Sequence, residues 1–228
     1  MNTNKVNDQT PWAFKVKDPG SALTHFAAMI GSIIAAAPLI IKAYHGSNRS
    51  YLSAFIIFIL SMIALYSAST IYHTFDISDK VNRILRKIDH AMIFVLIAGS
   101  YTPICLIVLP KNIGLPLLAT VWAITVVGTI FKICWITCPH WVSSVLYIGM
   151  GWLVVFAFSS IMANLSKSAF LWLLIGGIIY TVGGIIYALK IPVFKKHHWK
   201  NFGNHELFHC FVMVGSLCHF IMVYYYLA

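Results

Sequence analysis

Seven long apolar segments constrain this chain more than any other feature of its sequence. Short polar joints separate them, and they cover about residues 21–43, 52–73, 88–109, 114–134, 141–162, 168–189 and 205–227. A helix needs about 20 apolar residues to cross the hydrocarbon core of a bilayer, and each segment comes near this length. Because only helices and closed barrels satisfy all backbone hydrogen bonds in lipid, the pattern predicts an all-α polytopic membrane protein, a bundle of seven transmembrane helices.

The composition agrees with a membrane protein. Of the 228 residues, 60% are hydrophobic and 10% are charged, whereas about a quarter of the residues in a soluble domain are charged. The net charge of +10 could indicate nucleic-acid binding, but the charges lie in short joints between spans, so we expect no nucleic-acid partner. The joints leave no room for a second domain. We predict a polar tail over residues 1–20, without a signal-peptide pattern, and a single transmembrane domain over 21–228.

The distribution of Lys and Arg predicts the orientation of the bundle. If the joints alternate between the two faces, one face carries 12 of the 16 Lys and Arg residues and the other carries 4. Cytoplasmic loops carry the excess of positive charge in membrane proteins. The N-terminus is therefore predicted to be cytoplasmic and the C-terminus to lie outside.

Ionisable groups inside the spans are few, and such groups are candidates for function because their burial in lipid is costly. Ser69 and His73 close the second span, Asp89 opens the third, and His205 and His209 open the seventh. In the predicted orientation all three of these helix ends lie near the cytoplasmic face. Three separate helices would therefore deliver polar groups to one level of the membrane.

The spacing of these residues indicates a metal site. Residues four apart share a helix face, as Ser69 and His73 do, and as His205 and His209 do. Together His73, His205 and His209 could give a Zn²⁺ ion three imidazoles and leave one position open, the usual arrangement of catalytic zinc. Asp89 could hold a water molecule or accept its proton, and Ser69 could hydrogen-bond that water or the substrate. Three histidines also suit other transition metals.

Other features of the spans are expected to serve packing. We expect His25 and His219 to be packing or interfacial residues, and His90, next to Asp89, to point elsewhere on its helix. Four glycines of the sixth span repeat at a seven-residue interval and predict a smooth seam for a neighbouring helix: Gly176, Gly177, Gly183 and Gly184.

The start of the last span, "HELFH" (205–209), also fits the H-E-x-x-H pattern of zinc proteases, in which the glutamate is the general base. An intramembrane metalloprotease is therefore an alternative function, with Glu206 as its base. The second and third spans weigh against it, because they supply a further ligand and an acid without needing Glu206. In a protease, Glu206→Gln should abolish proteolysis, whereas lipid hydrolysis should be largely insensitive to it.

The whole pattern resembles the hemolysin III family, within the superfamily that contains the progestin and adipoQ receptors and the alkaline ceramidases. The residues that carry the resemblance are Ser69-x-x-x-His73, Asp89 and His205-x-x-x-His209. The stretches "ALTHF" (22–26), "SYTPICL" (100–106) and "GSLCHF" (215–220) are similar as well. The resemblance extends over essentially all seven spans.

This resemblance implies a multi-pass protein of the bacterial cytoplasmic membrane that binds zinc near the cytoplasmic face. His73, His205 and His209 would be the ligands, with Asp89 and Ser69 beside them. Known relatives imply hydrolysis of a lipid amide, ceramide in particular, or of an ester, with Asp89 moving the proton. The alternative is a non-enzymatic sensor or homeostasis protein in which zinc ties the second, third and seventh helices together. The expected partner is a membrane lipid, as substrate or ligand, and the oligomeric state stays open.

Overall fold

The computed structural model describes residues 15–190 and 202–228, and within these ranges the chain is helical and contains no strands. Seven helical segments are long and apolar enough to cross a membrane, which confirms the predicted all-α bundle. Three of these spans contain a change of helix type. The elements are α1 (Pro19–His45), η1 (Arg49–Tyr51), α2 (Leu52–Thr74), α3 (Asp79–Pro103), the π-helix η2 (Ile104–Val108), α4 (Lys111–Cys134), α5 (His140–Gly151), the 3-10 helix η3 (Trp152–Ala157), α6 (Phe158–Asn164), α7 (Lys167–Leu189) and α8 (Asn204–Tyr226).

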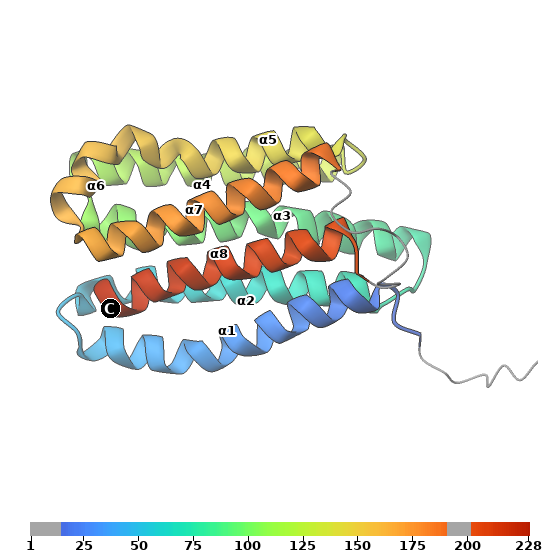
Figure 1. Cartoon of the computed structure of the whole chain (residues 1–228), viewed down its shortest axis with the longest axis horizontal. Helices are drawn as coiled ribbons and strands as arrows, with labels where there is room; N and C mark the ends of the chain where they lie inside the picture. The colour runs from blue at the N-terminus through green and yellow to red at the C-terminus, as the bar shows by residue number, and fades with distance from the viewer. Residues whose placement is uncertain (1–14, 191–201) are drawn as a thin grey trace, which may run out of the picture.

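The helices lie side by side along one direction (Figure 1). Helix α2 packs between α1 and α3, α4 packs on α3, and α7 packs between α5 and α8. Contacts between α1 and α8 join the first and last helices of the chain. The beginnings of α1, α3 and α8 and the end of α2 meet at one end of the bundle, and the C-terminus lies at the other (Figure 1).

The third span begins earlier than its apolar segment predicts. Helix α3 starts at Asp79, whereas hydropathy places the start at residue 88. The Ser78 side chain caps this helix by accepting a hydrogen bond from the Val81 backbone N–H at 3.4 Å. The charged residues that follow are compatible with a helix but not with the hydrocarbon core. Helix α3 therefore continues the span into the polar region beyond it.

The fifth span is one apolar segment in sequence but changes helix type halfway, at Trp152–Ala157. The hydroxyl group of Tyr101 on α3 hydrogen-bonds the backbone where the helix type changes. It accepts a hydrogen bond from the Val154 backbone N–H at 2.8 Å and donates one to the Gly151 carbonyl at 2.6 Å. A side chain of a neighbouring helix thus satisfies backbone groups at the irregular position, as an apolar surrounding requires.

Large apolar side chains fill the interior of the bundle. Large apolar side chains also cover much of its outer surface. Phe55, Phe58 and Phe94 are fully buried. In contrast, Leu23 is 69% exposed and Phe156 is 85% exposed. Exposed apolar residues on this scale have no favourable contact with water, so the outer surface is suited to lipid.

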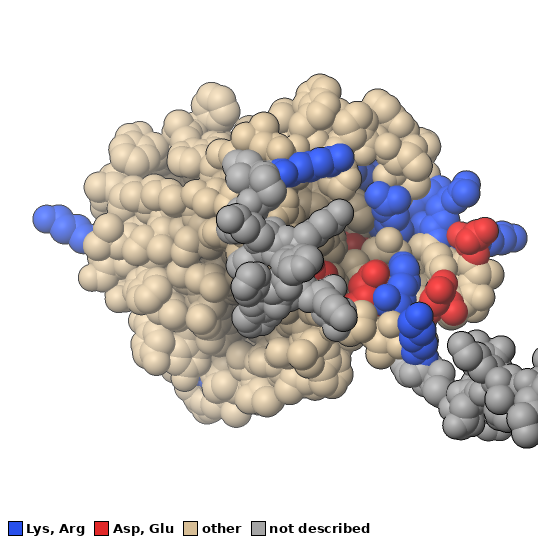
Figure 2. Space-filling view, turned by 45° about the vertical axis from the view of Figure 1, so that its right-hand side comes forward, with Lys and Arg blue, Asp and Glu red and all other residues tan. Residues whose placement is uncertain are grey.

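Charged side chains gather at the end of the bundle where α1 begins (Figure 2). Eight Lys and Arg residues of the described ranges lie at this end and four at the other. The first group is Lys15, Lys17, Lys80, Arg83, Arg86, Lys87, Lys132 and Lys190, and the second is Lys42, Arg49, Lys111 and Lys167. Part of the predicted charge of the "KIPVFKKHHWKNFGN" joint lies outside the described residues. The cytoplasmic placement of the charged end stays a prediction.

Glycines permit close helix contacts, as expected for a membrane bundle. A Cβ at Gly183 would lie 2.5 Å from Phe211, and one at Gly184 would lie 2.9 Å from Ile148, whereas Gly177 has open space. Some glycines of the predicted seam on α7 therefore contact side chains of neighbouring helices, and Gly177 does not. Helices α2 and α3 approach closely at Gly99, where a Cβ would come within 2.1 Å of the Ser61 Oγ and 2.5 Å of its Cβ.

The Gly99 contact generates a stability prediction. We expect Gly99→Ala to lower the free energy of unfolding by about 1–3 kcal/mol, because α2 and α3 must move apart to admit the methyl group. Thermal unfolding in detergent measures the effect. A matched control is Gly31→Ala, since a Cβ at Gly31 meets nothing within 4 Å; it should be neutral or stabilising. The double variant Gly99→Ala/Ser61→Gly should recover stability, and a failure to do so would contradict the packing explanation.

Candidate metal centre

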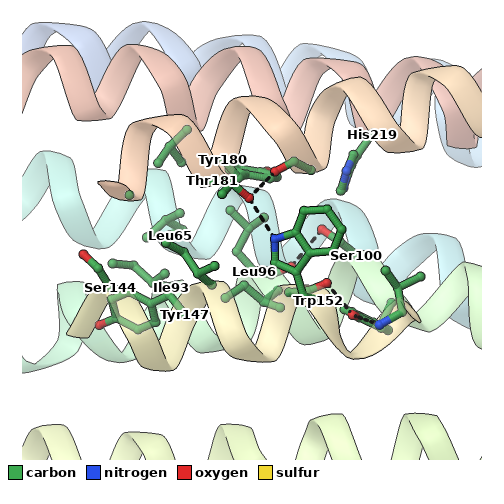
Figure 3. A pocket seen from close by; sticks show the side chains of 18 of the residues that line it. Leu65, Ile93, Leu96, Ser100, Ser144, Tyr147, Trp152, Tyr180, Thr181 and His219 are labelled. Carbon is green, nitrogen blue, oxygen red and sulfur yellow. Dashed lines mark hydrogen bonds between the residues drawn. The ribbon is translucent and has the colours of Figure 1, made fainter. Parts of the chain in front are cut away.

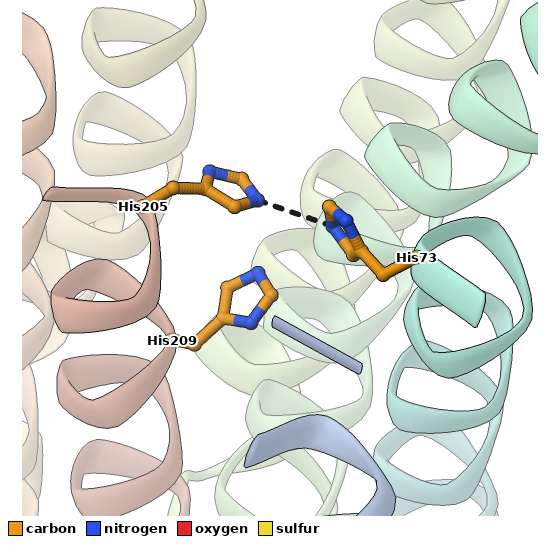
Figure 4. Close-up of side chains that lie close together, drawn as sticks. All are labelled: His73, His205 and His209. Atoms are coloured by element: carbon orange, nitrogen blue, oxygen red, sulfur yellow. Dashed lines mark hydrogen bonds between the residues drawn. The ribbon is translucent and has the colours of Figure 1, made fainter. Parts of the chain in front are cut away.

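Three histidines from two helices converge at the charged end of the bundle. His73 lies in the last turn of α2, and His205 and His209 lie one turn apart at the start of α8 (Figure 4). One ring nitrogen from each falls within 4.8 Å of the other two. The His73 and His205 Nε2 atoms are 3.1 Å apart, close to the roughly 3.3 Å expected between two nitrogens on a tetrahedral zinc with Zn–N bonds of about 2.0–2.1 Å. The predicted convergence of these three side chains is confirmed.

A carboxylate that the sequence analysis did not single out orients His73. Asp18, the residue that precedes α1, places its Oδ2 atom 3.0 Å from the His73 Nδ1. The backbone N–H of Asp18 also donates to the His73 carbonyl at 2.9 Å. A carboxylate on Nδ1 fixes the tautomer in which Nε2 carries the free lone pair, and metal-binding histidines commonly have such a partner.

His209 is oriented by a hydroxyl group on α1. The Thr24 Oγ1 atom lies 3.1 Å from the His209 Nδ1 and donates its own proton to the Ser21 carbonyl at 2.9 Å. Because that proton is used, we assign Oγ1 as the acceptor and His209 Nδ1 as the donor. This assignment leaves the Nε2 lone pair of His209 free. His73 and His209 are thus both held in the tautomer whose proton is on Nδ1.

His25 adjoins the three histidines directly. Its ring stacks on His209, with centroids 3.6 Å apart and an angle of 9° between the planes, and its edge meets Tyr66. His25 is buried, and neither of its nitrogens has a hydrogen-bond partner among the described residues. The expectation of a packing residue holds for its ring, but its nitrogens are not satisfied as those of a packing histidine would be.

Asp89 is buried at the start of the membrane-embedded part of α3, and lies within electrostatic reach of His25, His73 and His205. Its Oδ2 atom is 3.4 Å from the His90 Nδ1. The expectation that His90 points elsewhere is wrong, because its ring turns back to Asp89 and to the Arg86 carbonyl, 3.0 Å away.

Ser69 is fully buried one turn before His73. Its hydroxyl makes no hydrogen bond to any residue that the structure describes. Serines in spans usually donate to the carbonyl four residues earlier, as Ser100 does to Leu96 at 2.9 Å. The hydroxyl of Ser69 therefore keeps its full hydrogen-bonding capacity.

Glu206 is occupied by structural hydrogen bonds. Its Oε2 atom accepts the Gly203 backbone N–H at 2.7 Å, which caps the first turn of α8. Its Oε1 atom accepts a short hydrogen bond from the Ser21 hydroxyl on α1. Both carboxylate oxygens are thus engaged in joining α8 to its own N-terminus and to α1. This arrangement does not suit the general base that a protease would need.

A cavity of about 220 Å³ opens beside the histidines, and apolar side chains form most of its wall. Asp89, His205 and His209 lie along it, but His73 and Ser69 do not line it. The cavity then continues between α3, α5 and α7 toward the middle of the bundle (Figure 3). An apolar cavity with a few convergent polar groups is the usual form of a small-molecule site.

Comparison with known proteins identifies the family of this chain. Over residues 14–220 the sequence matches the family described as Haemolysin-III related. The chain belongs to this family. It is 37% identical to Hemolysin-3 of Bacillus cereus, over 98% of this chain and 97% of that protein. It is also 37% identical to the Hemolysin-3 homolog of Bacillus subtilis, over 93% and 96%.

A more distant relative extends the family to its superfamily. The chain is 32% identical to the ADIPOR-like receptor IZH2 of Saccharomyces cerevisiae, over 34% of this chain and 24% of that protein. The predicted resemblance is therefore confirmed at both levels. Bacterial relatives of nearly the same length, together with the seven apolar helices, make this hemolysin III family member a multi-pass protein of the bacterial cell membrane.

The capping role of Glu206 generates a prediction. Glu206→Ala should lower the free energy of unfolding by about 1 kcal/mol, because it removes the cap of α8 and the link to Ser21. Thermal unfolding in detergent measures this loss, and zinc content should be the same as in the wild-type protein. Loss of bound zinc with unchanged thermal stability would contradict the capping role.

Proposed function

We propose that this protein is a zinc-dependent membrane hydrolase that acts on a lipid amide or ester. In this proposal His73, His205 and His209 hold the metal ion. One observation carries it: three histidine nitrogens lie within 4.8 Å of one another at the border of an apolar cavity that also contains a buried carboxylate. A lipid chain in the cavity would bring its carbonyl group to the histidines.

The donors present fit a zinc ion. Three imidazoles are a common set of protein ligands for catalytic zinc, and the partners of His73 and His209 favour tautomers with a free lone pair. Ser69, one turn from His73, has a buried hydroxyl without a partner among the described residues. Such an orphaned hydroxyl is suited to a water molecule or a substrate oxygen at this centre.

A bound zinc ion would supply Lewis-acid polarisation of the substrate carbonyl and would activate water for attack. The chain's own residues would do the rest. Asp89, buried and acceptor-only when ionised, would take the proton of the attacking water and return it to the leaving group. The hydroxyl of Ser69 would hold the water or the carbonyl oxygen in place. The apolar walls of the cavity would exclude bulk water and strengthen each of these polar contacts.

A second candidate is a non-enzymatic sensor or homeostasis protein with a structural zinc. One observation favours it: the histidine centre joins α2 to α8, and Asp18 brings the start of α1 to the same place. A metal there would stabilise the packing of three helices without any turnover. The intramembrane protease is disfavoured because both oxygens of Glu206 are already hydrogen-bonded.

Metal content and turnover test the proposal together. Protein purified in detergent should contain about one zinc ion per chain, and the double variant His205→Ala/His209→Ala should lose it. The matched control His45→Ala/His140→Ala removes two histidines outside the centre and should keep the metal. Wild-type protein offered a panel of lipid amides and esters should release fatty acid, stop when a chelator removes the zinc and resume when zinc is restored.

The outcomes separate the candidates. Zinc without turnover on any substrate would favour the sensor, and absence of metal from carefully prepared wild-type protein would refute the histidine site.

The contact between Asp18 and His73 generates a separate prediction. Asp18→Asn should weaken zinc affinity about 10–100-fold, because the amide no longer fixes the imidazole as the carboxylate does. Competition against a coloured chelator measures the affinity. Asp79→Asn is the matched control, since Asp79 is exposed at the first turn of α3. The zinc affinity of this variant should equal that of the wild-type protein. Equal affinities in all three proteins would show that Asp18 does not act on the metal centre.

A further inference from the structure

The cavity contains a second polar position far from the histidine centre. His219 on α8 lines the same cavity as His205 and His209 (Figure 3). It follows His209 by ten residues, which corresponds to about 15 Å along the helix. Figure 3 places its ring near Trp152 and Ser100, away from Tyr147 and Ser144. The cavity is therefore long enough for an extended chain that reaches from one histidine position to the other.

The two nitrogens of His219 are buried and make no hydrogen bond with any residue that the structure describes. The Leu173 carbonyl approaches the ring but does not reach hydrogen-bond geometry. Buried polar atoms in proteins are nearly always paired, and an unpaired one calls for an explanation. A neutral imidazole offers one donor and one acceptor, and neither has a hydrogen-bond partner among the described residues.

The other polar groups around this part of the cavity already have partners within the protein. The Trp152 Nε1 donates to the Thr181 Oγ1 at 3.0 Å, and Thr181 donates to the Gly177 carbonyl at 2.7 Å. The hydroxyl of Tyr180 is 2.8 Å from the Ser216 Oγ. Ser100 donates to the Leu96 carbonyl at 2.9 Å. Of the described polar side chains at this level, the imidazole of His219 is thus the one that has no hydrogen-bond partner.

Helix α7 makes room for the imidazole. A Cβ at Gly176 would lie 2.4 Å from the His219 Cδ2 and 2.7 Å from its Nε2. Any residue larger than glycine at this position would displace the ring. The fold therefore accommodates an unpaired polar ring in an apolar wall. An aliphatic residue would fill the same space without the free-energy cost of burying unpaired polar atoms.

We propose that His219 recognises a hydroxyl group in the middle of the ligand's acyl chain, so that the substrates of this protein are lipids with a hydroxylated long chain. A hydroxyl both donates and accepts one hydrogen bond, which matches the neutral imidazole. A charged group is excluded, because the apolar wall offers it no counter-ion. The inference rests on the proposed function in one respect: the carbonyl of the ligand lies at the histidine centre, and the hydroxyl lies about 15 Å farther along the chain.

Binding of two natural fatty acids that differ by one hydroxyl tests this inference without any need for turnover. Ricinoleic acid is oleic acid with a hydroxyl in the middle of the chain. Equilibrium binding of each radiolabelled acid to the full-length, zinc-loaded protein in nanodiscs gives the affinity ratio. We expect wild-type protein to prefer ricinoleic acid about two- to tenfold, the net effect of one buried hydrogen bond.

Two variants locate the preference. His219→Leu should bring the affinity ratio to one, because leucine cannot hydrogen-bond. The matched control His45→Leu makes the same replacement at an exposed histidine at the far end of α1 and should keep the wild-type ratio. A preference that persists in folded His219→Leu would overturn the role of His219.

A ligand series on the wild-type protein decides the question if His219→Leu does not fold. Ricinoleic acid should bind better than its positional isomer with the hydroxyl beside the carboxylate, and better than its own methyl ether. Equal affinity of wild-type protein for all of these acids would overturn the inference.

The two proposals fail in different ways. A hydroxyl preference without hydrolysis would refute the proposed function alone, whereas hydrolysis of lipid amides without this preference would refute the role of His219 alone.

Discussion

The need to satisfy every polar group inside lipid governs the rest of this structure. It forces the chain into helices, because no other open structure hydrogen-bonds its own backbone. The same constraint explains local details, such as the hydroxyl of Tyr101 at the change of helix type at Trp152. Against this background, a few buried polar atoms, on His25, Ser69 and His219, have no hydrogen-bond partner among the described residues. They line or adjoin the histidine centre and its cavity, and so they mark positions where a bound water molecule or ligand would complete the hydrogen bonding.

The histidine centre also depends on residues other than the three histidines. Asp18 and Thr24 fix His73 and His209, and Glu206 fixes the first turn of α8. All three supporting groups belong to, or contact, the beginning of α1. The first helix thus supplies the outer layer of a centre whose candidate ligands come from α2 and α8. This division of roles explains how a short glutamate-containing motif can resemble a protease signature although its glutamate serves the helix.

The sequence predicted more of the candidate metal centre than of its surroundings. His73, His205 and His209 could be found because helical spacing and span orientation place them at one depth. The expectation that His90 points away from Asp89 is wrong. Adjacent residues leave a helix in different directions, but the His90 side chain is long enough to turn back to Asp89. Asp18 was missed, because it lies outside the hydropathy-defined span and pairs with His73 across 55 positions of sequence. A clue was present, in that an acidic residue directly precedes the proline that begins α1.

The sequence by itself determined the number of spans, the fold class and the level at which the polar residues gather. These follow from lengths and periods, which are properties of single helices. The tertiary structure decided which polar atoms are satisfied and which are free. It showed that Glu206 is engaged, that Ser69 has no hydrogen-bond partner within the described part of the chain, and that His219 shares a cavity with His209. Such facts depend on how neighbouring helices rotate and approach, and no single-helix pattern contains that information.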